Sequence, residues 1–170
     1  DVKTFMNSFN QLNGIPATGD EFLQRDILKG KWNFKGFVIS DWGSIGEMTT
    51  HGFAADEKKA AKYAANAGSD MDMESHVYVK FLKELVLSGK VSESKIDDAA
   101  GRILRVKFEL GLFEDPYKYC DEKREKELIF HQDHMEAALD MAKKSIVLLK
   151  NEKNLLPLAK KGKNIALIGH

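Results

Sequence analysis

The sequence has one cysteine, three prolines and no long apolar run. The single thiol, Cys120, cannot form an internal disulfide, which excludes a disulfide-stapled fold and leaves the compartment open. No apolar segment approaches the roughly 18 residues of a membrane-spanning helix, so we expect no membrane span. Acidic and basic side chains both number 26, and the formal net charge is zero. A chain without net charge has no global field that attracts nucleic acid or an anionic membrane, and we expect neither as a partner.

The composition is that of a folded protein. Hydrophobic residues make up 43% of the 170 residues and charged residues 31%, which suffices for a hydrophobic core in one domain. The first residues already have the pattern of a strand, and residues 164–170 stop at the end of another strand. We therefore expect the sequence to be a piece of a longer protein.

Strand and helix signals alternate along the first half of the chain. Strands are expected at 2–9 and 37–40, with a short strand or loop at 69–73, and helices between them at 18–29 and 56–67. This alternation predicts parallel βαβ units and an α/β fold. Three such units form only part of a sheet, and in a (β/α)₈ TIM-like barrel they would be the last βα units.

Capping residues and apolar spacing predict where the helices of the first half begin and which faces they bury. Thr18 and Glu21 fit a capping box, and Asp56 is the expected N-cap of an alanine-rich helix that ends at Gly68. The side chains expected to face inward are Phe22, Leu23 and Ile27 in the first helix and Ala60, Ala61, Ala64 and Ala65 in the second.

The second half of the chain is predicted to be mostly helical. The expected elements are helices at 79–87 and 94–110, a surface loop or exposed helix at 121–131, an amphipathic stripe at 135–146, a connector at 151–163 and a strand at 165–168.

The buried strand at 37–40 ends in a carboxylate, an indole and a glycine: Asp41, Trp42 and Gly43. In a barrel of parallel strands the active site lies at the carboxyl ends of the strands. Asp41 has that position, and so do the polar segments 7–10 and 70–73 after the flanking strands. We therefore expect these three segments to meet at one edge of the sheet.

The motifs at these strand ends resemble glycoside hydrolase family 3, the β-glucosidase type. The matching segments, in chain order, are Met6-Asn7-Ser8-Phe9-Asn10, Asn13-Gly14-Ile15-Pro16-Ala17-Thr18, Gly36-Phe37-Val38-Ile39-Ser40-Asp41-Trp42, His51-Gly52, Ala67-Gly68-Ser69-Asp70-Met71-Asp72-Met73, and Leu148-Leu149-Lys150-Asn151 followed by Leu155-Leu156-Pro157-Leu158. The resemblance covers essentially the whole chain. It implies that residues 1–115 are the C-terminal part of a barrel domain, that 116–160 are a linker, and that 161–170 begin an α/β sandwich domain.

The resemblance also implies a retaining, exo-acting hydrolysis of terminal β-linked glucosyl residues. The nucleophile is implied to be Asp41, with Met6, Phe9 and Trp42 in contact with an oligosaccharide or aryl β-glycoside substrate. A retaining glycosidase also needs a second carboxyl group as acid/base, which in the family is a glutamate of the second domain and is expected outside this chain. The chain alone is therefore expected to be inactive, and family members of this type are often periplasmic or secreted. Many members have tyrosine where this chain has Phe9.

Structural roles for the same carboxylates remain open at this point. Asp41 has the position of a helix N-cap or an ion-pair partner. Asp70 and Asp72 alternate as cation ligands do, but two acids supply few oxygen ligands, so we expect loop-capping roles, no metal ion and no cofactor.

Other functions and partners also remain open. Within the family, the alternatives are a β-xylosidase or a β-N-acetylglucosaminidase, and Trp42 argues against the latter. A nucleotide-binding module beginning at Ile165 would require a glycine-rich turn after His170. A fragment with three barrel strands exposes two sheet edges, so an oligomer is also expected.

Overall fold

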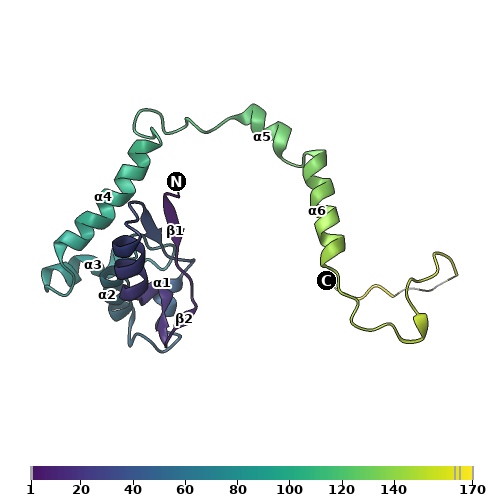
Figure 1. Ribbon diagram of the computed structural model, residues 1–170, viewed down its shortest axis with the longest axis horizontal. Coiled ribbons are helices and arrows are strands. Elements are labelled where there is room, and N and C mark those ends of the chain that lie inside the picture. The colour runs from purple at the N-terminus through teal and green to yellow at the C-terminus, as the bar shows by residue number, and fades with distance from the viewer. Residues whose placement is uncertain (1, 163, 165, 170) are drawn as a thin grey trace. The chain divides into compact units, whose positions relative to one another are not determined.

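The structure is a computed structural model that describes residues 2–162, 164 and 166–169, and it divides into two units, Asp1–Tyr119 and Cys120–His170 (Figure 1). The elements of the first unit are β1 (Thr4–Met6), β2 (Gln11–Leu12), β3 (Ile15–Pro16), η1 (Ala17–Gly19), η2 (Phe22–Lys31), β4 (Phe37–Ile39), α1 (Ser44–Glu47), α2 (Glu57–Ala67), α3 (Val77–Leu87) and α4 (Glu93–Glu109). Those of the second unit are α5 (Glu122–Leu128), α6 (Gln132–Ser145) and η3 (Glu152–Asn154).

The sheet of the first unit is parallel. β1 pairs with β4, with Phe5 opposite Val38, and a parallel bridge joins Ile39 to Met71 on the other side. The predicted α/β fold is therefore confirmed, with β4 between two parallel neighbours. β1 is shorter than the strand expected at 2–9, because the chain turns after Asn7 into a small hairpin of β2 and β3.

The hairpin turn is made by Asn13 and Gly14, whose φ values of 51° and 83° match the favoured two-residue hairpin turn. The next two residues, Ile15 and Pro16, form strand β3.

The capping box predicted at Thr18 is wrong. Thr18 lies inside η1, and the carboxylate of Asp20 accepts a hydrogen bond from the Leu23 N–H at 3.1 Å, so Asp20 caps η2. Glu21 instead faces the Lys95 ammonium at 4.0 Å. η2 has the wider turns of a π-helix. Of the three side chains expected to face inward, Phe22 is 55% exposed, whereas Leu23 and Ile27 are half-buried.

The alanine-rich helix forms as its sequence predicts. The Asp56 carboxylate accepts a hydrogen bond from the Lys59 N–H at 2.7 Å, and Gly68, with a φ of 105°, ends α2 in the left-handed conformation. The four predicted alanines are buried, which lets α2 pack closely on η1 and α3. The core of this unit consists of Ile45, Met48, Ala54, Ala60, Ala61, Ala64, Ala65, Val77, Leu85 and Val91.

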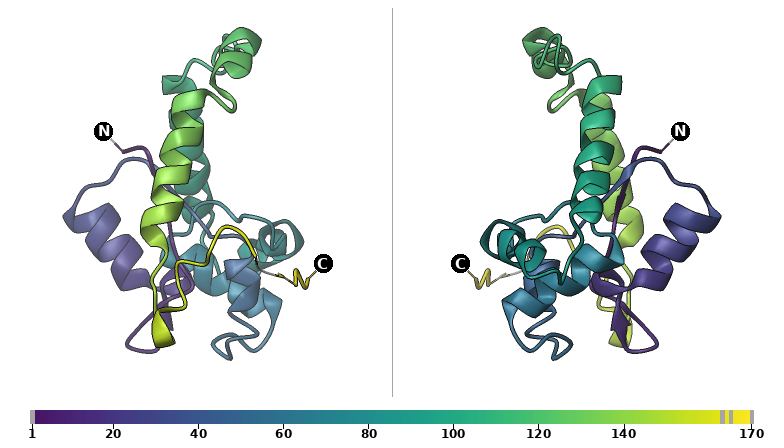
Figure 2. Two further views of the ribbon diagram at one scale, coloured as in Figure 1. Left: turned by 90° about the vertical axis from the view of Figure 1, so that its right-hand side faces the viewer. Right: turned by 90° about the vertical axis from the view of Figure 1, so that its left-hand side faces the viewer.

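The helix α3 begins at Val77, two residues earlier than expected, and α4 begins at Glu93, after Ser92. α4 starts beside the end of α2, where the Lys95 ammonium contacts Asn66, and runs to the start of β4 (Figure 2). The helix thus spans the layer of helices and reaches the sheet.

For residues 121–131 the sequence left a surface loop and an exposed helix open, and the structure has the exposed helix, α5. Asp121 caps α5 through the N–H groups of Lys123 and Arg124, and the His131 ring accepts a hydrogen bond from the Asp133 N–H at the start of α6. The strand expected at 165–168 includes Ile165, which lies outside the described residues; the described positions 166–168 have no regular secondary structure.

Within the described ranges, no helix has both the length and the apolar character needed to cross a membrane.

Candidate active site

The carboxyl ends of the three parallel segments lie side by side, as expected. The Asn7 N–H donates to the Ile39 carbonyl oxygen at 3.0 Å, which extends the pairing of β1 with β4 by one bond. On the other side, Ser40 and Gly43 donate to the carbonyl oxygens of Met71 and Met73 at 2.9 and 2.8 Å. Asp41 therefore lies on a turn whose backbone is held on both sides.

The Asp41 side chain is half-buried at the end of β4, and one carboxylate oxygen accepts a hydrogen bond from the backbone N–H of Trp42 at 2.7 Å. The described residues give Asp41 neither of the two structural roles that were open. In the part of the chain that the structure describes, Asp41 forms no ion pair. The N-cap of α1 is Gly43, and no side chain caps that helix.

Gly43 explains how the chain can leave the strand so sharply. Its φ of 71° lies in the left-handed region, which glycine adopts without strain, and α1 begins at the next residue. The turn leaves the Asp41 carboxylate half-buried at the edge of the sheet.

The three residues expected to contact substrate all lie at the ends of β1 and β4. Trp42 is 63% exposed, and Met6 is the last residue of β1, opposite Ile39. Phe9 is half-buried and packs edge-on against the His51 ring, with centroids 6.2 Å apart. Met6 also lines an apolar hollow of about 260 Å³ that includes Leu23, Ile27 and Trp32.

Asp72 has the loop-capping role that was expected, whereas Asp70 forms a buried ion pair with Lys29. The Asp70 carboxylate contacts the Lys29 ammonium at 2.6 Å and accepts a hydrogen bond from the Val38 N–H at 2.8 Å. Asp72 accepts hydrogen bonds from the Ser75 hydroxyl and from the Tyr78 N–H. Burial lowers the pKa of Lys29, and the Asp70 carboxylate opposes that shift.

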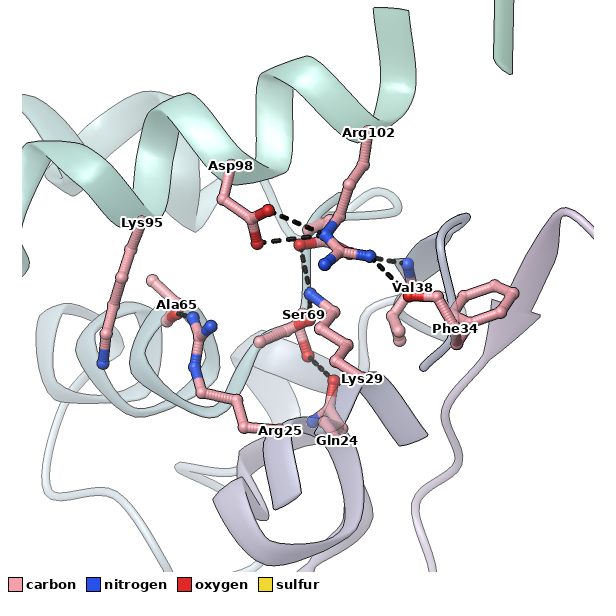
Figure 3. Close-up of polar contacts among 12 residues, drawn as sticks. Gln24, Arg25, Lys29, Phe34, Val38, Ala65, Ser69, Lys95, Asp98 and Arg102 are labelled. Carbon is pink, nitrogen blue, oxygen red and sulfur yellow. Dashed lines mark hydrogen bonds and ion pairs between the residues drawn. The ribbon is translucent and has the colours of Figure 1, made fainter. Parts of the chain in front are cut away.

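Arginines of η2 and α4 bind backbone carbonyl groups of neighbouring segments (Figure 3). Arg102 of α4 binds Asp98 at 3.0 Å and donates to the carbonyl oxygens of Phe34 and Gly36 at 2.8 and 2.9 Å. Arg25 of η2 donates to the carbonyl oxygen of Ala65 at 3.1 Å. These contacts position the helical layer around β4, and the sequence pattern did not single them out.

Comparisons with known proteins identify the family. The family model of the glycosyl hydrolase family 3 N-terminal domain matches residues 1–106. The chain belongs to glycosyl hydrolase family 3. It is 42% identical over 167 residues to a periplasmic beta-glucosidase of Salmonella typhimurium, covering 96% of this chain and 22% of that protein. It is 35% identical to a beta-xylosidase of Formosa agariphila, covering 99% of this chain and 24% of that protein.

Solved structures of family 3 proteins share the fold. A beta-glucosidase from Listeria innocua in complex with glucose superposes with a TM-score of 0.71 at 43% identity, covering 93% of this chain and 22% of that one. A D270A mutant of that enzyme, solved in complex with laminaribiose, gives the same TM-score. The chain thus spans between a fifth and a quarter of the length of these family 3 relatives.

Tyr78 gives the family 3 domain a titratable group next to the site. Its hydroxyl donates to the Ser69 carbonyl oxygen at 2.7 Å, and burial raises its pKa well above the usual 10.0. Above pH 10 the unfolded chain releases this proton while the folded chain keeps it, so the folded state binds more protons and stability falls as pH rises.

We expect Tyr78→Phe to lower the free energy of unfolding by about 1 kcal/mol at pH 8, because one hydrogen bond is lost. By pH 11 the parent should have lost about 1.4 kcal/mol that the variant keeps, because the variant has no phenol proton to release, so the difference should vanish or change sign. Urea unfolding of both proteins at several pH values measures it. Tyr117→Phe, at a phenol that is 74% exposed, controls for the substitution itself. A difference independent of pH would contradict the prediction.

Proposed function

We propose that this chain carries the nucleophile of a retaining, exo-acting β-glucosidase, and that the nucleophile is Asp41. The observation that supports this most is the position of its carboxylate. Asp41 follows the middle one of three parallel segments, at their carboxyl ends, and in the described part of the chain it is engaged neither in an ion pair nor in a helix cap. A nucleophile must be held on a rigid element and open to the substrate, and this placement supports both needs.

The proposed reaction has two steps. In the first, an oxygen of Asp41 bonds to the anomeric carbon of the sugar while the bond from that carbon to the leaving oxygen breaks, and a second carboxylic acid donates its proton to that oxygen. In the second step the acid/base carboxyl group, which lost its proton in the first step, takes a proton from a water molecule. The water oxygen bonds to the anomeric carbon while the bond from that carbon to Asp41 breaks. Two inversions at one carbon give net retention of the β configuration.

The neighbours of Asp41 fit contact with a sugar. The exposed Trp42 offers an apolar face for the C–H groups of a pyranose ring and an N–H for hydrogen bonding. We assign Phe9 and Met6 to the apolar wall on the β1 side. Phenylalanine at position 9 keeps an aromatic wall but has no hydroxyl group to donate to the nucleophile.

The acid/base carboxyl group is proposed to come from outside this chain, which spans about a fifth of its relatives. In this proposal residues 1–115 are the last βα units of a (β/α)₈ barrel, 116–160 are a linker, and 161–170 begin a sandwich domain. The full-length protein, meaning the longer protein that carries this chain, is the active form and is periplasmic or secreted. The chain alone is inactive and associates through its open sheet edges.

Glucose is proposed as the sugar, with xylose as the alternative. Relatives named as β-glucosidases and as β-xylosidases both match this chain. The two sugars differ at C5, where glucose carries a hydroxymethyl group. The ratio of kcat/KM for aryl β-glucoside to that for aryl β-xyloside decides between them, because specificity is a ratio of these constants.

Trapping with a fluorosugar tests the nucleophile. A 2-deoxy-2-fluoro-β-glucoside with a good leaving group reacts in the first step, but the fluorine slows the second, so the glycosyl-enzyme accumulates. We expect mass spectrometry of the full-length protein to find one sugar on the peptide that contains Asp41. A label on any other residue would reject the assignment.

A further inference from the structure

We infer that the hydroxyl of Thr18 is a positioning group for Asp41, acting through Ser44. Thr18 does not reach the sugar in this account; it holds the turn on which the nucleophile lies. The inference rests on the proposed function, because it assigns Thr18 a role in the same site.

Thr18 and Ser44 form a buried link beneath the turn. Their side-chain oxygens are 3.0 Å apart, and the two residues are 1% and 2% exposed. The Ser44 N–H donates to the carbonyl oxygen of Asp41 at 3.1 Å. Two hydrogen bonds therefore connect the Thr18 hydroxyl to the backbone of the nucleophile.

Counting protons gives these bonds a direction. A hydroxyl group has one proton to donate, and that of Thr18 has the Asn7 side-chain oxygen as an acceptor at 3.0 Å and the Ser8 carbonyl oxygen at 3.2 Å. We therefore assign the proton between the two hydroxyl oxygens to Ser44. Thr18 is thus an acceptor from the α1 side and a donor to the β1 side, and no apolar residue can replace both roles.

The chain of bonds continues to the start of the third parallel segment. The Asn7 amide donates to the Ser69 hydroxyl oxygen at 2.7 Å, and Ser69 donates to the Thr18 carbonyl oxygen at 2.9 Å. Gln24, 4% exposed, also donates to that carbonyl oxygen, at 3.0 Å. Among the described residues, no buried side-chain nitrogen or oxygen lacks a partner, so the cluster has no unused group to compensate for a lost one.

The test replaces Thr18 by valine, which keeps the shape and removes the hydroxyl. In the full-length protein we expect Thr18→Val to lower kcat and the rate of fluorosugar trapping by about 10- to 100-fold, because a small misplacement of a reacting group is costly. The KM of an aryl β-glucoside should stay within about threefold, since the sugar contacts are unchanged. Thr18→Ser, which retains the hydroxyl, should restore both rates to within about threefold.

Two further variants separate positioning from general damage. Thr49→Val removes a hydroxyl that donates to the Gly46 carbonyl oxygen at 2.8 Å, outside the cluster, and should leave the rates unchanged. Ser44→Ala breaks the same link from its other end and gives the result if Thr18→Val does not fold. The double variant should be no slower than the slower single variant, because both changes remove one link.

The outcomes distinguish this inference from the proposed function. If Thr18→Val and Ser44→Ala react at the parent rate while the fluorosugar still labels Asp41, the inference is wrong and the proposed function stands. If Thr18→Ser is as slow as Thr18→Val, the hydroxyl is not the group that matters, and the inference is also wrong. A label on a residue other than Asp41 overturns both.

Discussion

Asp41→Asn in the full-length protein is expected to lower kcat/KM for an aryl β-glucoside on the order of 10⁴-fold or more. A carboxamide is a much weaker nucleophile than a carboxylate and carries no negative charge to stabilise the positive charge that develops at the anomeric carbon. Initial rates at several substrate concentrations measure the effect. Asp97→Asn, at an exposed position of α4, is the matched control and should keep the parent rate.

Asp41→Gly allows a second readout that general damage cannot produce. The missing side chain leaves space for azide, which can attack the anomeric carbon from the face that Asp41 would have used. We expect azide to accelerate the variant and to yield the α-glucosyl azide, since one inversion occurs instead of two. The parent protein should not be accelerated. Absence of rescue together with an active Asp41→Asn variant would assign the nucleophile elsewhere.

The parts of the fold that local sequence predicted are those that local contacts determine. Asp56 is three residues from the N–H that it caps, and Gly68 lies at the end of the helix that it terminates. The edge of the sheet was predictable for a similar reason. A short apolar run followed by a carboxylate and a glycine predicts a strand end, and parallel strands place their ends together.

The parts that the sequence did not predict depend on residues far apart in the chain. Thr18 matches a capping box locally, but its hydroxyl binds Ser44, which is 26 residues away, and Asp20 caps the helix instead. The partner of Lys29 is Asp70, 41 residues away, and no periodicity links the two. Buried polar pairing of this kind appears only once the strands and helices are placed in space.

The Lys29–Asp70 pair gives the largest expected effect on stability. Their side chains are 6% and 2% exposed, so neither charge is screened by water. Asp70→Asn can still accept the Val38 N–H, but its amide then turns N–H donors toward the Lys29 ammonium. We expect the free energy of unfolding to fall by about 3–5 kcal/mol, because a buried cation loses its partner. Urea unfolding of the full-length protein and hydrogen exchange of the β4 amides measure this loss.

Removing both charges should recover most of that stability. Lys29→Met with Asp70→Asn retains an acceptor for Val38 and leaves no buried cation, so we expect it to unfold within about 1–2 kcal/mol of the parent. Glu57→Gln, which breaks the exposed Lys80–Glu57 pair, should cost less than about 1 kcal/mol. The defect of Asp70→Asn should also shrink as pH rises toward 10.5, the usual pKa of lysine. Burial lowers the pKa of Lys29 and the Asp70 carboxylate opposes that shift, so without the carboxylate the pKa falls further and the folded variant releases its proton at a lower pH than the folded parent. A defect that is constant with pH and persists in the double variant would contradict the assignment of the loss to the unpaired Lys29 charge.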